Sequence, residues 1–578
     1  MIGSKAGGWV CFLVALLPIA AIVRLIGKYA VNVPWGDEWS LVPLFAKWHD
    51  HQLTLSDLLR QHNEHRIFFP KLIYLAFAHW THWNVKAEMF FSVLLCCATS
   101  AGIYLLLERT VPGTSRKRLL LWALINLLIF APVQAENWLW GFQLQMFIPN
   151  LCLVGCLVVL TSRLADVQKI IGSALLATVA TFSFGGGVLL WPVIAFYLVF
   201  KRERVGQLVA WTAVFVIVAL IYFTGYQRLA SAGPKLGNRL DYVAYFANFL
   251  GIALSRCSFS TQAVVTAGSI GVLGFLLYLI ACWFFFQASP KMRAAAAPWL
   301  ALGAYAICSA ALAAYTRVDG GPQQALNSRY ATISANLYIG LLGLVAVAAQ
   351  AARANEVAQK IAPLVAALAA PVFTAILTLS AISFPAGIEH MEILQRLRLE
   401  GAAHLQFCQV IGPSEKLPID LMIGASLPAI VLEADLLDRL HLLNPPLRRS
   451  AMLRDGEDRT HRSTDEFGRT EGVEQKDIDR FEIHGWCFLP DHGRPAPSVL
   501  LAYQIDGNWN TLGLVEPRDV RPDIATRMRR KNYSSSGWRA VVHRKLLPPT
   551  ATRLSAWAFD PAVGETYKLP GDFILPAR

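Results

Sequence analysis

Two acidic residues, Asp37 and Glu38, stand side by side in the segment VNVPWGDEWS at 31–40, directly after the first long apolar run of the chain. A carboxylate partly withdrawn from water can act as a general base. Because adjacent residues of a helix or strand point in different directions, we expect one of the two to face a substrate, and we favour Asp37. The alternative is structural, with either acid favouring the start of a helix.

A second group of reactive side chains, His62, Glu64, His65 and Arg66, follows in QHNEHR at 61–66. In a helix the two histidines would share a face, and with a carboxylate they could hold a divalent metal ion. His-x-x-His spacing alone is not specific, so we assign no metal ligand and keep a divalent metal as an alternative. We expect Arg66 to pair with a phosphate or with Glu64, and the histidines to orient a substrate. The plainer alternative is a polar loop among lipid headgroups.

The elements that must position these residues are membrane helices. Of the 578 residues 55% are hydrophobic and only 16% are charged, and the mean hydropathy is +0.43, which excludes an ordinary soluble protein. A span needs roughly 20 apolar residues. Eleven such runs are predicted, at 9–27, 87–107, 119–135, 146–162, 170–184, 186–200, 206–223, 263–286, 295–314, 331–350 and 361–383.

Basic residues predict the orientation. The N-terminus and alternate connections between the predicted spans carry fourteen Lys and Arg residues against four acids, a pattern typical of the cytoplasmic face. This places the N-terminus inside, and the loop at 28–86, with Asp37, outside. It also accounts for much of the net charge of +13 through anionic headgroups, with no need for nucleic acid.

The segment 67–83 decides whether this count holds. It is apolar but contains Pro70, Lys71, His79 and His82, and counting it as a span would move the basic loops to the wrong side. We therefore expect a helix lying in the outer interface, with an unorthodox span as the alternative. Short amphipathic helices are also expected between Glu38 and Leu59, one of them capped by Ser56 and Asp57.

An acidic pair in the first outer loop, followed by interfacial helices, about eleven spans and an outer soluble domain, resembles the GT-C superfamily of polyprenyl-phosphate-sugar-dependent glycosyltransferases. The resemblance covers residues 1–385 and depends on W-G-D-E-W after the first span. It implies that Asp37, or its neighbour Glu38, deprotonates an acceptor hydroxyl. It further implies a multi-pass protein of the bacterial inner membrane, a polyprenyl-phosphate-linked sugar donor, and a glycan, lipid or protein acceptor on the periplasmic side.

Further outer segments offer groups that could complete such a site. Trp138 and Trp140 could stack on a sugar with Gln143 as a hydroxyl partner, although an aromatic belt at the membrane surface is an equal alternative. Arg317 and Arg329, the latter followed by Tyr330, bracket a Gly-Pro turn. The donors of a guanidinium match phosphate oxygens, so we favour Arg329 as a ligand of the lipid phosphate. The alternatives for Arg329 are pairing with Asp319 and extension to the lipid headgroups. The loop within 223–246 is expected to cover a lipid-binding cleft.

The chain after the last span differs in composition. Helical segments and a charged linker are expected over 386–477, and short alternating strands over 478–578 predict a periplasmic β-sandwich. The resulting fold class is an α-helical polytopic membrane protein with a C-terminal β domain. A transporter or flippase of a lipid-linked saccharide is the rival to a transferase, but charged residues in mid-span, which transport pathways usually require, are almost lacking after the first span.

Overall fold

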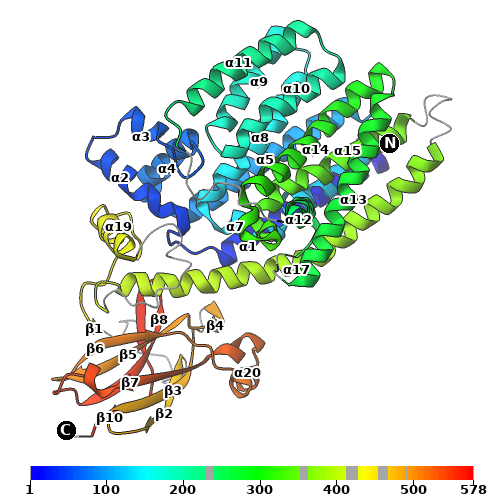
Figure 1. Ribbon diagram of the computed structural model, residues 1–578. Helices are drawn as coiled ribbons and strands as arrows, with labels where there is room; N and C mark the ends of the chain where they lie inside the picture. Colours follow the sequence, from blue (N-terminus) through cyan, green and yellow to red (C-terminus); the bar gives the residue numbers. More distant parts are fainter. Residues whose placement is uncertain are drawn as a thin grey trace. The chain divides into compact units, whose positions relative to one another are not determined.

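The computed structural model describes residues 2–227, 238–256, 258, 260–351, 362–411, 427–453, 467–489 and 492–576. The chain forms two compact units, each described by itself below (Figure 1). The first unit comprises Met1–Ala30, Thr54–Phe77 and Lys86–Leu394. The second unit comprises Val31–Leu53, Ala78–Val85 and Gln395–Arg578.

Nine helices among the described residues are long and apolar enough to cross a membrane, which confirms a multi-pass membrane protein. They include α1 (Ile2–Tyr29), α5 (Val85–Thr110), α6 (Ser115–Ile129), α8 (Leu144–Leu160), α11 (Val205–Phe223), α13 (Thr261–Phe286), α14 (Pro290–Arg317), α15 (Ala331–Ala351) and α17 (Ala362–Phe407). The predicted spans at 170–184 and 186–200 correspond to the shorter helices α9 (Asp166–Thr181) and α10 (Leu190–Lys201). The count of eleven stays a prediction.

Helix α17 differs from the sequence prediction. It is continuous over 46 residues and passes through Pro385, whereas the sequence predicted the end of the membrane domain at residue 385 and a separate helix beyond it. Leu, Ile and Ala residues continue at helical spacing past the proline, so the periodic apolar pattern is not interrupted there. The boundary between the two units falls later, after Leu394.

Short helices occupy the connections at the ends of the spans. They are η1 (Gly36–Leu41), α2 (Val42–His49), α3 (Leu55–Leu59), α4 (Phe68–Thr81), α7 (Ala135–Leu139) and α12 (Arg239–Gly251). Helix α4 has 14 residues, fewer than a span needs, as expected for the segment 67–83. The predicted cap of α3 is wrong by two positions, because the side chain of Thr54, rather than Ser56, accepts the hydrogen bond from the Asp57 amide.

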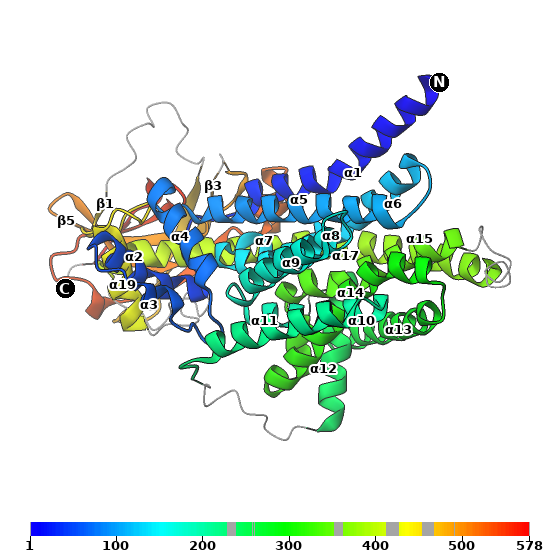
Figure 2. The same cartoon turned by 90° about the horizontal axis from the view of Figure 1, so that it is seen from above.

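The helices of the first unit run side by side, with α8 beside α9 and α14 beside α15 (Figure 2). Neutral polar side chains join some of them. The Asn336 amide donates to Asn150 Oδ1 at 2.8 Å, joining α15 to α8. The Asn126 amide donates to the carbonyl of Ala15 at 2.8 Å, joining α6 to α1. Such amides satisfy one another without placing a charge in the membrane.

The second unit ends in two antiparallel sheets (Figure 1). One has the strand order β1-β6-β5-β8-β10 with β9 beside β8, and the other has β2-β3-β4 with β7 beside β3. Side chains of both sheets, among them Phe481, Trp538, Val499 and Ala556, form one buried cluster. The strands are β1 (Met452–Leu453), β2 (Gly468–Gln475), β3 (Arg480–Leu489), β4 (Arg494–Pro495), β5 (Ser498–Ile505), β6 (Asn508–Val515), β7 (Gly537–His543), β8 (Arg553–Asp560), β9 (Glu565–Lys568) and β10 (Phe573–Ile574).

The charged linker expected over 448–477 contains two of these strands. Strand β2 pairs with β3 over almost its full length, and β1 pairs with β6. Strand β2 lies beside a single neighbour, and most of its side chains are exposed or half-exposed. Its charged residues therefore suit an edge strand, although they suggest a linker in the sequence.

Candidate functional site

The turn after α1 holds the two acidic residues in different environments. Gly36 opens η1 with a positive φ of 57°, a conformation that favours glycine. Two residues on, the side chain of Glu38 is only 1% exposed. Its Oε2 accepts a hydrogen bond from the backbone N–H of Trp35 at 2.8 Å, so it fixes the start of the turn.

Asp37 remains partly exposed on the same turn. Its backbone carbonyl accepts a hydrogen bond from the Ser40 hydroxyl at 2.6 Å, which holds the second half of η1. The two neighbouring acids thus differ in exposure, because Glu38 is buried and Asp37 is partly exposed. This turn belongs to the second unit.

Arg398 is a residue that the sequence did not single out. It lies on the part of α17 that belongs to the second unit, and only 3% of it is exposed. Its guanidinium carbon is 4.8 Å from the centre of the Trp35 ring, a cation–π contact with the residue that opens the acidic turn. Nothing in the sequence around Arg398 indicates that this arginine is buried rather than exposed.

The segment 61–66 forms a tight turn rather than a helix. The backbone groups of His62 and His65 exchange two hydrogen bonds, each 2.8 Å long, and Asn63 has a positive φ of 47°. The expectation of a shared helical face for the two histidines is therefore wrong. Asn and Gly are the residues that most readily adopt this conformation in turns.

His65 is enclosed by aromatic and backbone groups of the first unit. Its ring lies 4.8 Å from that of Phe184 and touches Gly185, where an added methyl group would fall 2.3 Å from Nδ1. Nδ1 is buried and has no hydrogen-bond partner among the described residues. Burial lowers the pKa of His65 to about 4, Glu64 raises it and Arg317 lowers it further. The side chain is therefore neutral at physiological pH.

Arg66 and Lys71 hold backbone segments together. Arg66 donates to the carbonyls of Tyr222, Leu59 and Thr224 at 2.6–2.7 Å. The Lys71 ammonium donates to the carbonyls of Asp57, Leu58 and Arg60 at the end of α3, and burial lowers its pKa to about 8. Three of the Arg66 donors thus bind backbone carbonyls, and its pairing with a phosphate or with Glu64 stays a prediction.

Two ion pairs bring distant segments of the first unit together. Arg317, at the end of α14, lies 3.5 Å from the Glu64 carboxylate. Arg329, in η8 (Ser328–Tyr330) before α15, lies 3.9 Å from the Glu136 carboxylate. We call these four residues, with His62, His65, Tyr245 and Tyr330, the polar cluster. Asp319 was considered as an alternative partner of Arg329, but the carboxylate that lies near this arginine is that of Glu136.

Glu136 is the residue that fixes η8. Its Oε2 accepts hydrogen bonds from the Ser328 hydroxyl at 2.9 Å and from the Arg329 amide at 3.1 Å. The guanidinium of Arg329, at 3.9 Å, is beyond hydrogen-bond distance of this carboxylate. Arg329 is therefore held by its backbone and retains guanidinium donors that can bind another anion. The sequence alone does not indicate that Glu136 contacts Ser328 and Arg329, which lie almost 200 positions later.

Tyr245, on α12, interacts electrostatically with the arginines of both ion pairs, Arg317 and Arg329. Burial raises its pKa, Tyr330 raises it further, and Arg317 and Arg329 oppose the shift. The Tyr330 ring also lies 4.9 Å from that of Phe249 and 5.5 Å from the Arg329 guanidinium carbon. The cluster thus combines two cations, two carboxylates and two phenols at one end of the first unit.

The aromatic residues of 136–145 are core residues in the structure. Trp138 has no exposed surface, stacks on Phe147 at 5.0 Å and donates from Nε1 to the Ala131 carbonyl. Trp140 and Gln143 are each 4% exposed, and Trp140 stacks on Phe142. The expected stacking surface for a sugar is therefore not presented by these two tryptophans, because the interior of the unit covers them. His62 packs on Phe142 at 5.3 Å.

Within the described ranges, no group of three or more His, Cys, Asp or Glu side chains is arranged to hold a metal ion. In particular, the turn at 62–65 directs His65 against Phe184, away from the metal geometry considered for a helix. Of the segment 223–246, which was expected to be a loop over a cleft, residues 228–237 lie outside the described residues. The part from Arg239 onward belongs to helix α12 rather than to a loop.

No family model matches the chain, and no curated protein matches it. Among solved structures it is similar to the archaeal oligosaccharyltransferase AglB from Archaeoglobus fulgidus, in complex with an inhibitory peptide and a dolichol-phosphate. The two are 12% identical, with a TM-score of 0.40, and the alignment covers 76% of this chain. The chain matches 60% of the length of that protein.

Proposed function

We propose that the chain is a membrane glycosyltransferase of the GT-C type, which transfers a sugar from a polyprenyl-phosphate carrier to a cell-envelope acceptor on the periplasmic side. The observation that carries the proposal is the accessibility of Asp37 beside the buried cap Glu38, directly after the first span. A base needs an accessible carboxylate on a fixed backbone, and the turn provides both.

The proposed reaction is a direct displacement. The acceptor hydroxyl attacks the anomeric carbon of the sugar, the bond from that carbon to the phosphate oxygen breaks, and Asp37 takes the hydroxyl proton. The carrier leaves as polyprenyl phosphate, and the sugar inverts its configuration. Cations stabilise the charge that develops on a leaving phosphate, and the phosphate-binding role of Arg317 and Arg329, which belong to the first unit, stays a prediction.

The polar groups of the first unit support a transferase better than a transporter. The contacts between α8 and α15 and between α1 and α6 are made by neutral amides. The ion pairs of the polar cluster join the end of α14 and the start of α15 to connecting segments. Charges at one end of the helices suit chemistry at one membrane surface, whereas a transport pathway usually has ionisable groups along its length.

The proposal is tested by the chemical fate of the carrier in detergent, where a membrane no longer separates two compartments. Carrier lipids and acceptor glycans are extracted from cells that lack the protein and are incubated with the purified chain. We expect mass spectrometry to show free polyprenyl phosphate and an acceptor heavier by one sugar. A transporter would leave both masses unchanged, and that result would overturn the proposal. Envelope glycans of cells with and without the protein identify the acceptor class.

A further inference from the structure

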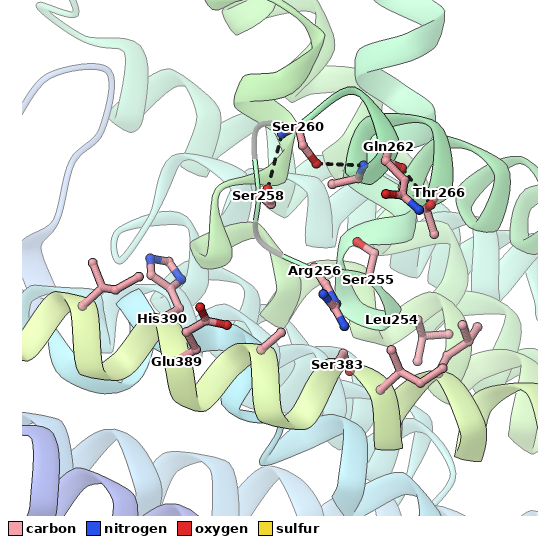
Figure 3. A pocket seen from close by; sticks show the side chains of 15 residues that line it. Leu254, Ser255, Arg256, Ser258, Ser260, Gln262, Thr266, Ser383, Glu389 and His390 are labelled. Atoms are coloured by element: carbon pink, nitrogen blue, oxygen red, sulfur yellow. Dashed lines mark hydrogen bonds between the residues drawn. The ribbon is translucent and has the colours of Figure 1, made fainter. Parts of the chain in front are cut away.

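A cavity of about 630 Å³ lies within the first unit, separate in its lining from the polar cluster (Figure 3). One wall is α17 between Leu379 and Ile393. The other is formed by residues before and at the start of α13, namely Leu254, Ser255, Arg256, Ser258, Ser260, Gln262, Ala263 and Thr266. Both helices are largely exposed along their most apolar stretches, with only 22% of these residues buried. In a membrane, such surfaces face lipid.

The segment before α13 gives the cavity an anion-binding side. Arg256 is exposed to it and forms no hydrogen bond or ion pair through its side chain with any described residue. Ser255 is 4% exposed, and its buried Oγ has no hydrogen-bond partner among these residues. A buried hydroxyl without a partner costs free energy, which a ligand oxygen would recover.

The beginning of α13 adds backbone polarity to the same side. The helix is 26 residues long, and Ser260 caps it by accepting a hydrogen bond from the Ala263 amide at 3.3 Å. Figure 3 shows Ser255 near this helix start and the Arg256 side chain extending from the same segment toward Ser383 of α17. The first amides of a long helix attract anions, and an adjacent guanidinium reinforces the attraction.

The opposite wall is mixed. Leu379, Ile382 and Ile393 of α17 are apolar, whereas Glu389 and His390 extend toward the cavity from the same helix (Figure 3). Glu389 has no ion pair with Arg256 or with any other described residue. A carboxylate across from an anion site is compatible with a ligand that carries both a phosphate and hydrogen-bond donors.

We propose that this cavity binds a phosphodiester lipid, with its phosphate at Ser255, Arg256 and the start of α13, its headgroup hydroxyl or amine groups at Glu389, and its chains against the apolar residues of α17. Free inorganic phosphate has neither a headgroup nor chains, so it meets only the first of these three requirements. The lipid can come from the bilayer or be a polyprenyl-phosphate-linked saccharide, and these two sources share the chemistry that the cavity recognises.

Lipid binding to the purified, delipidated full-length chain tests this assignment by native mass spectrometry. The probes are phosphatidylethanolamine, phosphatidylglycerol, phosphatidic acid, a polyprenyl-phosphate-linked sugar and inorganic phosphate. We expect Arg256→Gln to weaken binding of the phosphodiester lipids about tenfold, because charge-assisted hydrogen bonds to phosphate are lost. Ser255→Ala should weaken it less, and Arg239→Gln, which changes an exposed arginine of α12 outside the cavity lining, should leave it unchanged.

Glu389→Gln distinguishes the contribution of the lipid headgroup to binding from that of the phosphate. It should weaken phosphatidylethanolamine and phosphatidylglycerol but not phosphatidic acid, which has no donor-bearing headgroup. Equal binding by all variants, or inorganic phosphate binding as tightly as the lipids, would overturn the assignment. Preference among the lipid probes identifies the source. Because the readout is binding, the assignment can fail while sugar transfer is observed, or hold while transfer is absent.

Discussion

The carboxylate of Glu38 accepts a hydrogen bond from the backbone amide of Trp35 at 2.8 Å, and this contact commits one of two adjacent acids to structure. Glu38 is buried and Asp37 is partly exposed, so the two neighbouring carboxylates have different environments. Glu38 shapes the turn, and Asp37 remains accessible on it. The roles proposed for the pair can therefore be separated by substitution.

Asp37→Asn should abolish sugar transfer and leave the thermal unfolding midpoint in detergent unchanged, since an amide keeps the shape but cannot take a proton. Glu38→Ala should mainly affect stability. We expect it to lower the free energy of unfolding by about 1 kcal/mol, because the cap of the turn is lost. Glu38→Gln is the matched control, because its amide oxygen can still accept from Trp35. Full transfer activity in Asp37→Asn would remove this residue from the role of base.

Substitutions of Glu136 and of Arg329 should differ in their effects on stability and on sugar transfer. Glu136→Ala removes the acceptor of the hydrogen bonds from the Ser328 hydroxyl and the Arg329 amide and should cost about 1–3 kcal/mol, measured as a lower unfolding midpoint. Arg329→Gln keeps those backbone contacts, so its midpoint should fall less while transfer is lost.

Arg66→Gln provides the comparison for Arg329. Its guanidinium binds three carbonyls, so we expect stability and activity to fall together. If Arg329→Gln lost stability as severely as Arg66→Gln, Arg329 would be a structural residue rather than a phosphate ligand.

His65 predicts a pH dependence of stability. Its pKa is lowered from 6.5 to about 4 in the folded chain. Between these values the unfolded chain binds a proton that the folded chain excludes, so the free energy of unfolding falls as the pH is lowered. The loss should reach on the order of 2–3 kcal/mol by pH 4. Unfolding midpoints recorded from pH 7 to pH 4 should fall less steeply for His65→Gln than for the native chain.

The exposed His543 of β7 serves as the control for this measurement. His543→Gln should retain the slope of the native chain. An identical slope in the native chain and in His65→Gln would show that burial of this imidazole does not contribute to the acid sensitivity.

Trp138 should behave as a core residue. Trp138→Ala should destabilise the chain by about 3–5 kcal/mol, as deletions of buried aromatic side chains do. Trp138→Phe keeps the stacking on Phe147 but not the hydrogen bond to Ala131, and should retain sugar transfer at temperatures below its unfolding midpoint. Loss of transfer in a folded Trp138→Phe protein would restore the stacking role that the sequence suggested.

The membrane helices were predictable because a span is a local property of composition. About 20 apolar residues in a row suffice, and the described part of the chain contains such runs at all nine helices. Strand β2 was not predictable in this way. Arg469 and Glu471 alternate with its buried residues, but together with Glu474 they suggest a charged linker. Its place in a sheet follows from pairing with β3, which local sequence does not encode.

The candidate site was predictable by residue type but not by role. An arginine near a membrane can bind phosphate or carbonyls, and Arg66 binds carbonyls because Tyr222 and Thr224 reach it from more than 150 positions away. Glu136 was missed for the same reason, since Ser328 and Arg329 lie almost 200 positions later. Such choices depend on tertiary contacts, whereas Asp37 could be proposed from its position after a span.

Gly185 and His65 provide a test of how tightly the turn at 62–65 is held. A methyl group at position 185 would fall 2.3 Å from Nδ1 of His65, so Gly185→Ala must displace the ring. We expect a cost of about 1–3 kcal/mol in the native chain, as for other overpacked sites. In a His65→Ala background the same substitution should cost much less, because the obstructing ring is absent.

Two further glycines make the Gly185 result specific. Gly187→Ala should destabilise both backgrounds equally, because its methyl group would meet the backbone oxygen of Ala180 at 1.9 Å rather than a side chain. Gly206→Ala, with no atom within 4 Å of the added carbon, should be neutral or stabilising in both. A cost of Gly185→Ala that is the same with and without the His65 ring would mean that the ring moves aside freely. The turn would then leave His65 loosely packed, and its lowered pKa would lose its structural cause.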